Sequence, residues 1–263
     1  MKPTLAEYFK SVVISVWFVF ALLLCVIILV VGLLISFGTL RDKLVAWLGF
    51  FLGRSTLWVA GIRFRLKYVG PVPNQPAVFI MNHSSTLDLF IVISMWLPNI
   101  RFVAKRELLY NPLFFIAGKL TDHIFIDRKN SQKSIEMLNK AIEKIRKNRL
   151  SVFFAPEGTR KHEGVIGKFK HGAFYMAYDL GYPIVPIYVE GTRELCPGNS
   201  LVTRKGTVTA YIHPPIDLSV YKKNEIPELV KSIRRQYMDW AGINDENENH
   251  RLDPRKAETD AHQ

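Results

Sequence analysis

A histidine and an aspartate five positions apart are the side chains in this sequence best suited to acid–base chemistry. They are His83 and Asp88, in the stretch NHSSTLD that directly follows the apolar run AVFIM (77–81). In a continuous helix this spacing would turn the two side chains about 140° apart, and in a strand it would put them on opposite faces. We therefore expect a strand that ends near Met81, a turn that holds Asn82 and His83, and a helix whose first turn carries Asp88.

Other reactive side chains follow further apolar runs that predict strands: Lys105 after IRFVA, Asp127 and Arg128 after HIFI, and Glu157, Thr159 and Arg160 after SVFFAP. The carboxyl ends of parallel strands share one edge of a sheet, and open α/β sheets bind ligands there. A base together with several cations suits a reaction on an anionic substrate. Phosphate is the natural anion, because Arg binds it bidentately and Lys binds it as a point charge.

The pattern of apolar runs predicts the elements that position these residues. Short apolar runs alternate with longer segments from residue 69 onward, which is typical of strands alternating with helices. Residues 131–149 carry one apolar stripe and predict an amphipathic helix. Because most of the short runs are apolar throughout, we predict an α/β fold with a mostly parallel mixed sheet flanked by helices. The candidate strands are residues 77–81, 100–104, 123–126, 151–155, 184–189 and 207–212.

The amino-terminal segment is long and apolar enough to enter a membrane. Residues 11–40 contain no charged side chain, and a helix needs about 20 apolar residues to cross a bilayer. A cleaved signal peptide has a shorter apolar region, so we expect an anchor that stays attached. A straight helix of this length exceeds the roughly 30 Å hydrocarbon core, which leaves spanning and re-entrant arrangements open. Residues 45–68 predict a helix at the membrane interface, or else a core helix of the soluble domain.

These features divide the chain into three parts. We expect residues 1–66 to form the membrane anchor and interfacial helix, residues 67–243 the catalytic domain, and residues 244–263 a polar, disordered tail. We expect the inner (cytoplasmic) membrane with the catalytic domain facing the cytoplasm. The slight excess of basic residues after the apolar segment favours this orientation. The two cysteines, Cys25 and Cys196, are far apart, which favours a reducing compartment over a disulfide framework or a cysteine metal site.

Composition narrows the class of partner. The net charge of +12 calls for an anionic partner such as nucleic acid, lipid headgroups or a phosphorylated substrate. The basic residues are dispersed without a recognised binding motif, so a membrane-anchored module that binds nucleic acid or another macromolecule is disfavoured. No H-E-x-x-H motif or cluster of Cys and His occurs, so we expect no metal. A serine hydrolase that uses Ser84 or Ser85 is an alternative, although the chain lacks a G-x-S-x-G motif.

Four ordered blocks of residues resemble the signature blocks of the glycerolipid acyltransferase family, and especially of bacterial 1-acyl-sn-glycerol-3-phosphate acyltransferases. The first is NHSSTLD, and the second is VAKRELLYNPLFFIAGKLTDHIFIDR. The third is APEGTR followed by GKFKHGAFYMA, and the fourth is GYPIVPI, so the resemblance covers about residues 76–192. Two positions depart from the family pattern, since Asp122 or a neighbour stands where glycine is common and Ala155 where phenylalanine is usual.

The resemblance implies an acyltransferase with a general base and no covalent acyl-enzyme. In the family the histidine deprotonates the free hydroxyl of lysophosphatidate, which attacks the thioester of acyl-CoA or acyl carrier protein without a further cofactor. His83 would be this base and Asp88 would orient it. The other candidate residues would bind the substrate: Lys105, Arg128, Glu157, Gly158, Thr159 and Arg160. The cations among them would bind its phosphate, and Glu157 would contact its glycerol portion.

The resemblance leaves the acceptor and the donor partly open. Another lysophospholipid or a lyso-aminolipid is an alternative acceptor, and acyl carrier protein is an alternative donor and partner to CoA. Membrane lipids are expected partners, because an anchored enzyme meets its amphiphilic substrates at the interface. We also expect an apolar groove for the acyl chain. Backbone N–H groups at the start of the helix after His83 should stabilise the thioester oxyanion.

Overall fold

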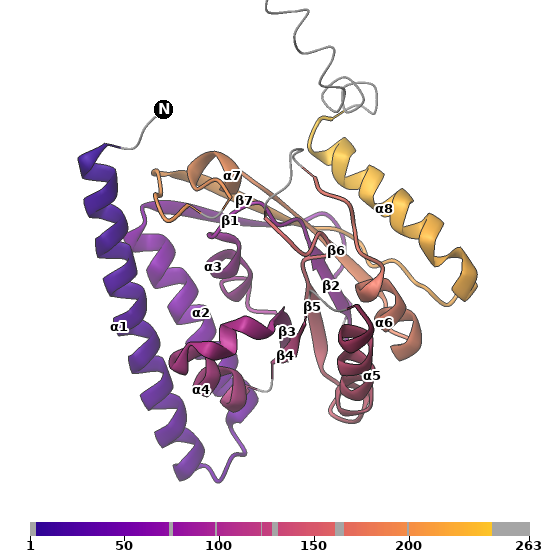
Figure 1. The fold of residues 1–263 in the computed structure, drawn as a ribbon, viewed down its shortest axis with the longest axis horizontal. Coiled ribbons are helices and arrows are strands. Elements are labelled where there is room, and N and C mark those ends of the chain that lie inside the picture. The colour runs from indigo at the N-terminus through magenta and orange to yellow at the C-terminus, as the bar shows by residue number, and fades with distance from the viewer. Residues whose placement is uncertain are drawn as a thin grey trace, which may run out of the picture.

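A mixed sheet organises the fold (Figure 1). The computed structural model describes residues 4–73, 76–97, 99–121, 123–127, 131–160, 166–198 and 200–243. In this part of the chain seven strands form one sheet in the order β1-β7-β6-β2-β5-β3-β4, and all neighbours are parallel except β6 and β7. The strands are β1 Ile62–Tyr68, β2 Val78–Met81, β3 Ile100–Lys105, β4 Ile124–Ile126, β5 Ser151–Phe154, β6 Ile184–Glu190 and β7 Gly206–Ile212. The predicted fold class is confirmed, and every candidate strand forms within one residue of its expected bounds.

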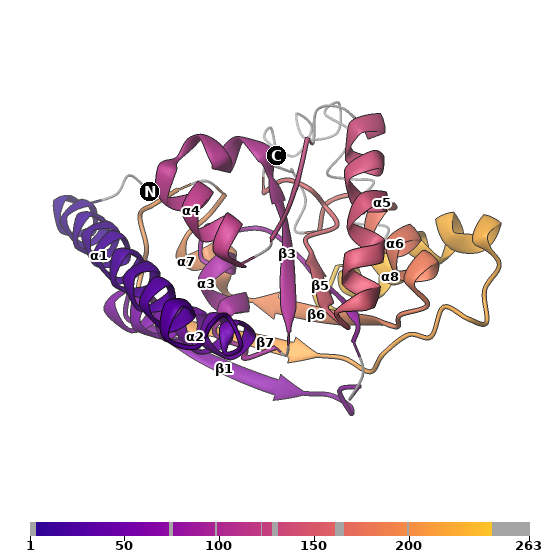
Figure 2. The ribbon, with the colours of Figure 1, turned by 90° about the horizontal axis from the view of Figure 1, so that it is seen from below.

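Helices cover both faces of the sheet, which explains why its strands are apolar throughout (Figure 2). One face carries α1 Leu5–Ile35, α2 Arg41–Val59, α3 Asp88–Ile93 and α4 Pro112–Thr121. The other carries α5 Ser131–Lys147, the predicted amphipathic helix, with α6 Gly172–Leu180 and α8 Ile226–Trp240. Because both faces are covered, every residue of the central strands β2 and β5 is buried. The short elements are α7 Thr192–Leu195 and the 3₁₀ turns Arg106–Tyr110 and Lys223–Glu225.

The single helix predicted over residues 45–68 is wrong in its second part. Helix α2 ends at Val59, and Gly61 turns the chain with a φ of 67°. Strand β1 then begins at Ile62 and pairs in parallel with β7. Its residues IRFRLK alternate apolar and basic side chains, which is the period-two pattern of a half-buried strand. Strand β1 therefore belongs to the sheet. It contains residue 66, at which the anchor was expected to end.

Helices α1 and α2 form an antiparallel hairpin along one side of the molecule (Figure 1). α1 buries one stripe with helical spacing, which includes Ile14, Ala21, Cys25 and Leu29, while its outer faces are exposed and largely apolar. At the turn of the hairpin the side chain of Phe37 is 94% exposed. Of the helices in the described residues, α1 alone is long and apolar enough to cross a membrane, which supports membrane association. The tail expected over residues 244–263 lies outside the described residues.

Candidate active site

The turn between β2 and α3 brings His83 and Asp88 together. Strand β2 ends at Met81 and α3 begins at Asp88, so the predicted strand–turn–helix arrangement is confirmed. Nδ1 of His83 lies 2.8 Å from Oδ2 of Asp88. The same carboxylate oxygen accepts hydrogen bonds from the backbone N–H groups of Ser84 and Ser85 at 2.8 and 2.9 Å. Asp88 therefore closes the turn and holds the imidazole at the same time.

Burial differs sharply between the two partners of this pair. The Asp88 side chain is 2% exposed, whereas that of His83 is 22% exposed. A carboxylate can only accept a hydrogen bond, so Nδ1 of His83 carries a proton and the lone pair lies on Nε2. A buried aspartate in this position fixes the tautomer and stabilises the imidazolium that forms when Nε2 takes up a proton. The pair has the geometry of a general base and its orienting group.

Glu157 is bound to the backbone on both sides of the site. It follows β5, which pairs with β2, and it is 4% exposed. Its Oε1 accepts from the backbone N–H of His83 at 2.7 Å, and its Oε2 accepts from the N–H of Gly167 at 2.8 Å. In this arrangement Glu157 supports the turn that carries His83, while its expected contact with the glycerol portion of a substrate stays a prediction.

Arg160 also reaches the NHSSTLD turn. Its guanidinium donates to the hydroxyl of Thr86 at 3.0 Å. Between Glu157 and Arg160 the chain turns at Gly158, whose φ is 71° and whose N–H donates to the carbonyl of Ala155. A Cβ at Gly158 would lie 3.0 Å from Cε of Lys170, so the lysine stem packs directly over this turn. The residues APEGTR therefore present one cation, the Arg160 guanidinium, beside the histidine turn.

Two predicted substrate-binding cations are not placed in this group. Lys105 ends β3, which is separated from β2 by β5, and it pairs with Glu107 at 3.3 Å. Arg128 lies outside the described residues, as does Asp122. Thr159 is exposed beside Arg160. Within the described residues, no group of three or more His, Cys, Asp or Glu side chains could hold a metal ion.

Both serines of the turn are buried and serve its structure. The Ser84 hydroxyl lies 3.2 Å from that of Thr192, and the Ser85 hydroxyl donates to the Cys196 carbonyl at 2.6 Å. These contacts disfavour either serine as a nucleophile. The N–H of Leu87 donates to the Ser85 hydroxyl, while the N–H groups of both serines donate to Asp88. The expectation that N–H groups here stabilise an oxyanion is therefore wrong for these three, because the turn itself uses them.

Asn82, which was expected in the turn, has a supporting contact that the sequence did not predict. Its side-chain amide donates to the Val189 carbonyl and accepts from the Val189 N–H, both at 2.8 Å. This contact joins the end of β2 to β6 directly before His83. Its position immediately after a buried strand is the only local signal for such a role, because its partner is 107 residues away.

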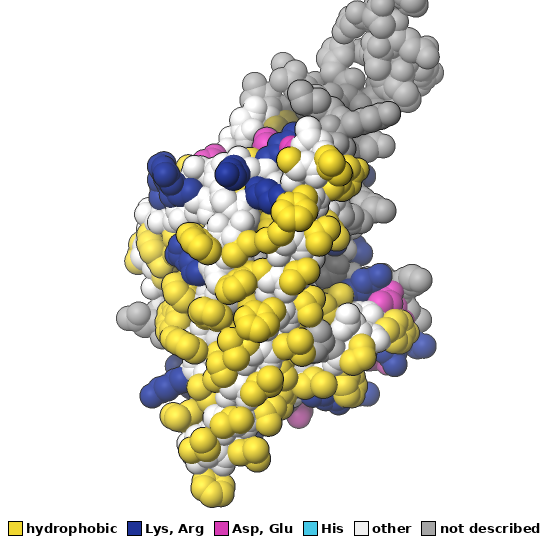
Figure 3. Space-filling view, turned by 90° about the vertical axis from the view of Figure 1, so that its left-hand side faces the viewer, with side chains coloured by type: hydrophobic (Ala, Val, Ile, Leu, Met, Phe, Trp, Pro, Cys, Tyr) yellow, Lys and Arg dark blue, Asp and Glu magenta, His cyan; other side chains and the backbone are white. Residues whose placement is uncertain are grey.

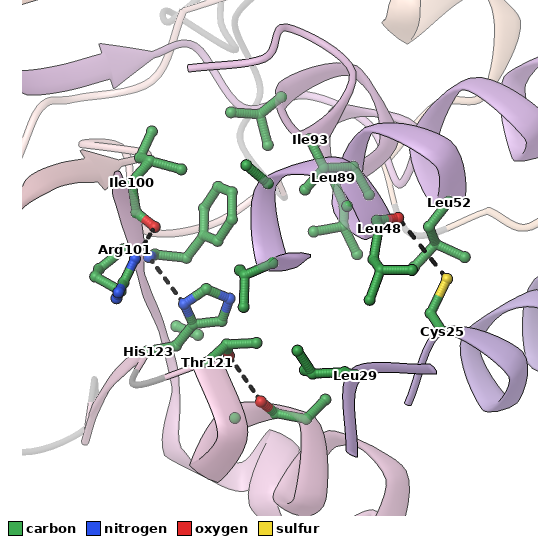
Figure 4. A pocket seen from close by; sticks show the side chains of 18 of the residues that line it. Cys25, Leu29, Leu48, Leu52, Leu89, Ile93, Ile100, Arg101, Thr121 and His123 are labelled. Carbon is green, nitrogen blue, oxygen red and sulfur yellow. Dashed lines mark hydrogen bonds between the residues drawn. The ribbon is translucent and has the colours of Figure 1, made fainter. Parts of the chain in front are cut away.

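An apolar cavity of about 240 Å³ begins next to the turn (Figure 4). Leu89, the residue after Asp88, lines it together with side chains from α1, α2, α4, β3 and β4. Most of the lining is apolar, as at Cys25 and Leu48. Figure 4 shows Arg101 and His123 on the side of the cavity opposite Cys25. Arg101 is buried and pairs with Asp42 at 2.6 Å, so one side of the cavity is polar.

The surface over α1 is a broad apolar face (Figure 3). Large apolar side chains cover most of this view, and Lys and Arg side chains lie mainly around its edges. The exposed apolar residues of this part of the molecule include Val12, Val16, Phe20, Ile27 and Val31 of α1, Trp47 and Phe51 of α2, and Phe115 and Ile116 of α4. An apolar face edged by cations is suited to a membrane interface.

Comparisons with known proteins agree with this geometry. A model of the acyltransferase family matches residues 63–190. A 1-acyl-sn-glycerol-3-phosphate acyltransferase of Limnanthes douglasii is 31% identical over 212 residues, which are 80% of this chain and 74% of that protein. The enzyme of the same name from Saccharomyces cerevisiae is 34% identical over 178 residues, 66% of this chain and 59% of that protein.

A solved structure shares the fold. The crystal structure of a 1-acyl-sn-glycerophosphate acyltransferase from Thermotoga maritima superposes with a TM-score of 0.71. The match covers 89% of this chain and 98% of that one, at 21% sequence identity. The α/β sheet and its flanking helices are thus an architecture already known from another protein.

Proposed function

Because the chain belongs to the acyltransferase family and is an O-acyltransferase, we propose that it acylates the sn-2 hydroxyl of 1-acyl-sn-glycerol-3-phosphate. The product is phosphatidate, made for phospholipid biosynthesis, and the donor is acyl-CoA or acyl carrier protein. The observation that carries the proposal is the His83–Asp88 pair, which lies beside Arg160 and at the start of an apolar cavity. The names of the relatives supply the substrate class.

His83 acts as the general base in this reaction. Its Nε2 takes the proton of the acceptor hydroxyl while that oxygen attacks the thioester carbonyl. The tetrahedral intermediate then collapses, the C–S bond breaks, and the proton passes from the imidazolium to the leaving thiolate. Asp88 stabilises the imidazolium, and the buried serines leave the substrate hydroxyl as the nucleophile. Base catalysis contributes about 10² to 10⁴ in rate, so positioning of the two substrates supplies much of the rest.

The phosphate of the acceptor binds on the same edge of the sheet. Arg160 offers a guanidinium that can hold phosphate bidentately, and Lys170 packs over the neighbouring Gly158 turn. Lys105 ends β3, two strands away from β2 on this edge of the sheet. The contribution of Arg128, which the sequence predicts, stays a prediction. The exposed Thr159 can contact the same headgroup.

The apolar cavity holds an acyl chain. It starts at Leu89, beside Asp88, and extends between α3, α4 and the helix hairpin. Each methylene buried there contributes about 0.8 kcal/mol to binding, so the usable length of the cavity sets the preferred chain. The ion pair between the buried Arg101 and the partly exposed Asp42 makes one boundary of this space polar, which disfavours hydrocarbon there.

The helix hairpin lies in the membrane interface without crossing the bilayer. α1 packs along α2, and at the turn of the hairpin Arg41 donates to the Leu120 carbonyl while Asp42 pairs with Arg101. A spanning α1 would therefore draw the soluble domain into the hydrocarbon core. We place the outer face of α1 against lipid and the catalytic domain on the cytoplasmic side of the inner membrane. The anchor is then the α1–α2 hairpin, and the catalytic domain begins at β1.

A transfer assay tests this function. Membranes that contain the protein are incubated with labelled acyl-CoA or acyl carrier protein and a panel of lysolipids. Lysophosphatidate should be acylated by the wild type and by His171→Ala, an exposed control, but not by His83→Ala. Transfer only to a lysolipid without a phosphomonoester would change the assigned acceptor. Full activity of His83→Ala would exclude the mechanism.

A further inference from the structure

Helix α8 lies on the face of the sheet opposite α1 (Figure 2). It spans Ile226–Trp240, beyond the residues that the family model matches. Arg234 and Tyr237 are three positions apart, so they lie on one face of the helix. Both side chains hydrogen-bond to backbone groups of the segments that support His83 and Glu157.

The Tyr237 hydroxyl lies between the central strands β2 and β6. It accepts a hydrogen bond from the Ile187 N–H at 3.0 Å and donates one to the Ile80 carbonyl at 2.8 Å. A regular parallel ladder would join this N–H and this carbonyl directly, because Ile80 is paired with Pro186. The hydroxyl therefore bonds to both strands where their pairing continues to Met81 and Ile187, just before β2 ends.

Asn82 makes a second contact with β6, one residue beyond the end of β2. Its side chain makes both hydrogen bonds to the Val189 backbone that the main chain of β2 would otherwise make. The chain thus leaves the sheet between two defined contacts, one at Tyr237 and one at Asn82. His83 is the next residue, so these contacts set the position of its backbone.

Arg234 supports the other half of the site. Its guanidinium donates to the carbonyls of Ile166 and Gly167, both at 3.0 Å. The N–H of Gly167 donates to Glu157, which in turn accepts from the N–H of His83. A continuous chain of hydrogen bonds therefore runs from α8 to the histidine.

The environment of Tyr237 keeps its hydroxyl protonated. The side chain is fully buried, and this burial raises its pKa well above the ordinary value, with a further increase from the nearby Glu157 carboxylate. The hydroxyl therefore retains the proton that it donates to Ile80. Without it, the Ile187 N–H and the Ile80 carbonyl each lose a hydrogen-bond partner in the core.

We propose that Tyr237 and Arg234 are positioning residues, and that α8 is a clamp that fixes His83 relative to Glu157. The inference rests on the proposed function, because the clamp serves the base that accepts the proton of the acceptor hydroxyl. Both side chains act through backbone groups, so their loss should displace the base without removing the groups that bind substrate. A displacement of about 1 Å at a reacting group can lower the rate about 100-fold.

The first test is Tyr237→Phe, which removes the hydroxyl and keeps the ring. We expect kcat to fall about 10- to 100-fold, while KM for lysophosphatidate changes by less than about threefold. Tyr188→Phe is the matched control, because Tyr188 is also buried and packs against the Tyr237 ring. The control variant should keep its kcat even where its Tm falls by as much as that of Tyr237→Phe.

The second test is Arg234→Gln, a change at a partly buried side chain that leaves the core of α8 intact. The same loss of kcat with little change in KM is expected, because the Gly167 peptide is released from the helix. Arg234→Lys should restore part of the rate, since a lysine can still donate to one of the two carbonyls. Lys231→Gln removes an exposed cation from the same helix and should have no effect.

An NMR measurement tests whether α8 positions His83 without relying on the transfer assay. The imidazole resonances of His83, assigned by their loss in His83→Ala, should shift in Tyr237→Phe and Arg234→Gln and stay in place in both controls. Unchanged kcat and unchanged resonances in the two variants would overturn the clamp. If the wild type transfers no acyl group, the proposed function fails, and the resonances still decide whether α8 positions His83.

Discussion

The backbone N–H of His83 donates to Oε1 of Glu157 at 2.7 Å, while the ring of the same histidine faces Asp88. Two carboxylates therefore control different parts of one residue. Asp88 sets the orientation of the imidazole, and Glu157 sets the position of the peptide to which it is attached. This division separates the effects that substitutions at the two acidic residues should have.

Glu157→Gln should weaken both the site and the fold. The carboxylate accepts from two backbone N–H groups, at His83 and Gly167, and an amide has only one oxygen to offer. One buried N–H is left unpaired, which costs about 1–3 kcal/mol of unfolding free energy. Thermal unfolding and kcat should both decrease, whereas Glu190→Gln, at an exposed carboxylate, should change neither. Wild-type kcat in Glu157→Gln would contradict the supporting role.

Asp88→Asn should lower kcat with little change in KM. The amide is nearly the same size, but it carries no charge to stabilise the imidazolium, and its NH₂ group can face Nδ1 of His83 and impose the wrong tautomer. We expect a loss of about 10² to 10⁴ in kcat, the range of general-base catalysis. Asp217→Asn, at an exposed loop carboxylate, is the control. A mutant that retains more than about a tenth of wild-type kcat would argue against the proton transfer.

Gly49→Leu should shorten the preferred acyl chain. Gly49 lines the apolar cavity, and a Cβ there would meet its nearest neighbour, Ile93, only at 4.0 Å. The leucine can therefore enter the cavity and displace part of the acyl chain. Displacing two methylenes costs about 1.6 kcal/mol, which is a loss of roughly tenfold in kcat/KM for a long-chain donor relative to a short one.

Competition between donors of two chain lengths measures this change in preference. Gly49→Ala adds a single methyl group and should give an intermediate selectivity. An unchanged preference in Gly49→Leu would remove the cavity from the proposed acyl-binding role.

His213 should make the fold sensitive to acid. Its ring stacks on Trp240 with centroids 3.5 Å apart, and burial lowers its pKa below the ordinary value of 6.5. The unfolded chain therefore binds the proton first as the pH falls, and stability decreases from pH 6.5 down to the lowered pKa of the folded state. Above pH 6.5 His213 adds no pH dependence.

His213→Phe keeps a ring against Trp240 and removes the titration. Unfolding free energies of wild type and variant, measured from pH 8 to pH 5, should diverge only below about pH 6.5. Parallel curves over the whole range would show that this histidine is not buried in its neutral form.

The turn at the site was predictable because its constraint is local. No regular helix or strand can join His83 to Asp88, so the spacing itself demanded the strand end and the helix start that the structure contains. The strands were predictable for a similar reason, since burial on both faces makes them apolar throughout. The sequence does not predict strand β1, because its alternating basic residues suit an interfacial helix equally well.

The residues that support the site from other parts of the chain could not be predicted from local sequence patterns. Tyr237 meets Ile80 across 157 positions, and Ser85 meets the Cys196 carbonyl across 111. Such contacts depend on how the strands are ordered and how the helices pack on the sheet, which no local pattern in the sequence encodes. The contacts of Asp88 with the N–H groups of Ser84 and Ser85 are local, but the motif does not show that Asp88 binds these N–H groups as well as the His83 ring.

The hairpin that lies along the domain has a consequence for the membrane itself. An enzyme held by a hairpin that turns back would meet only one of the two lipid leaflets. It would take a single-chain lipid from that leaflet and return a two-chain lipid to it, so each turnover would enlarge one monolayer alone. The other monolayer would depend on separate proteins that carry lipids across, and growth of the bilayer would be uneven without them.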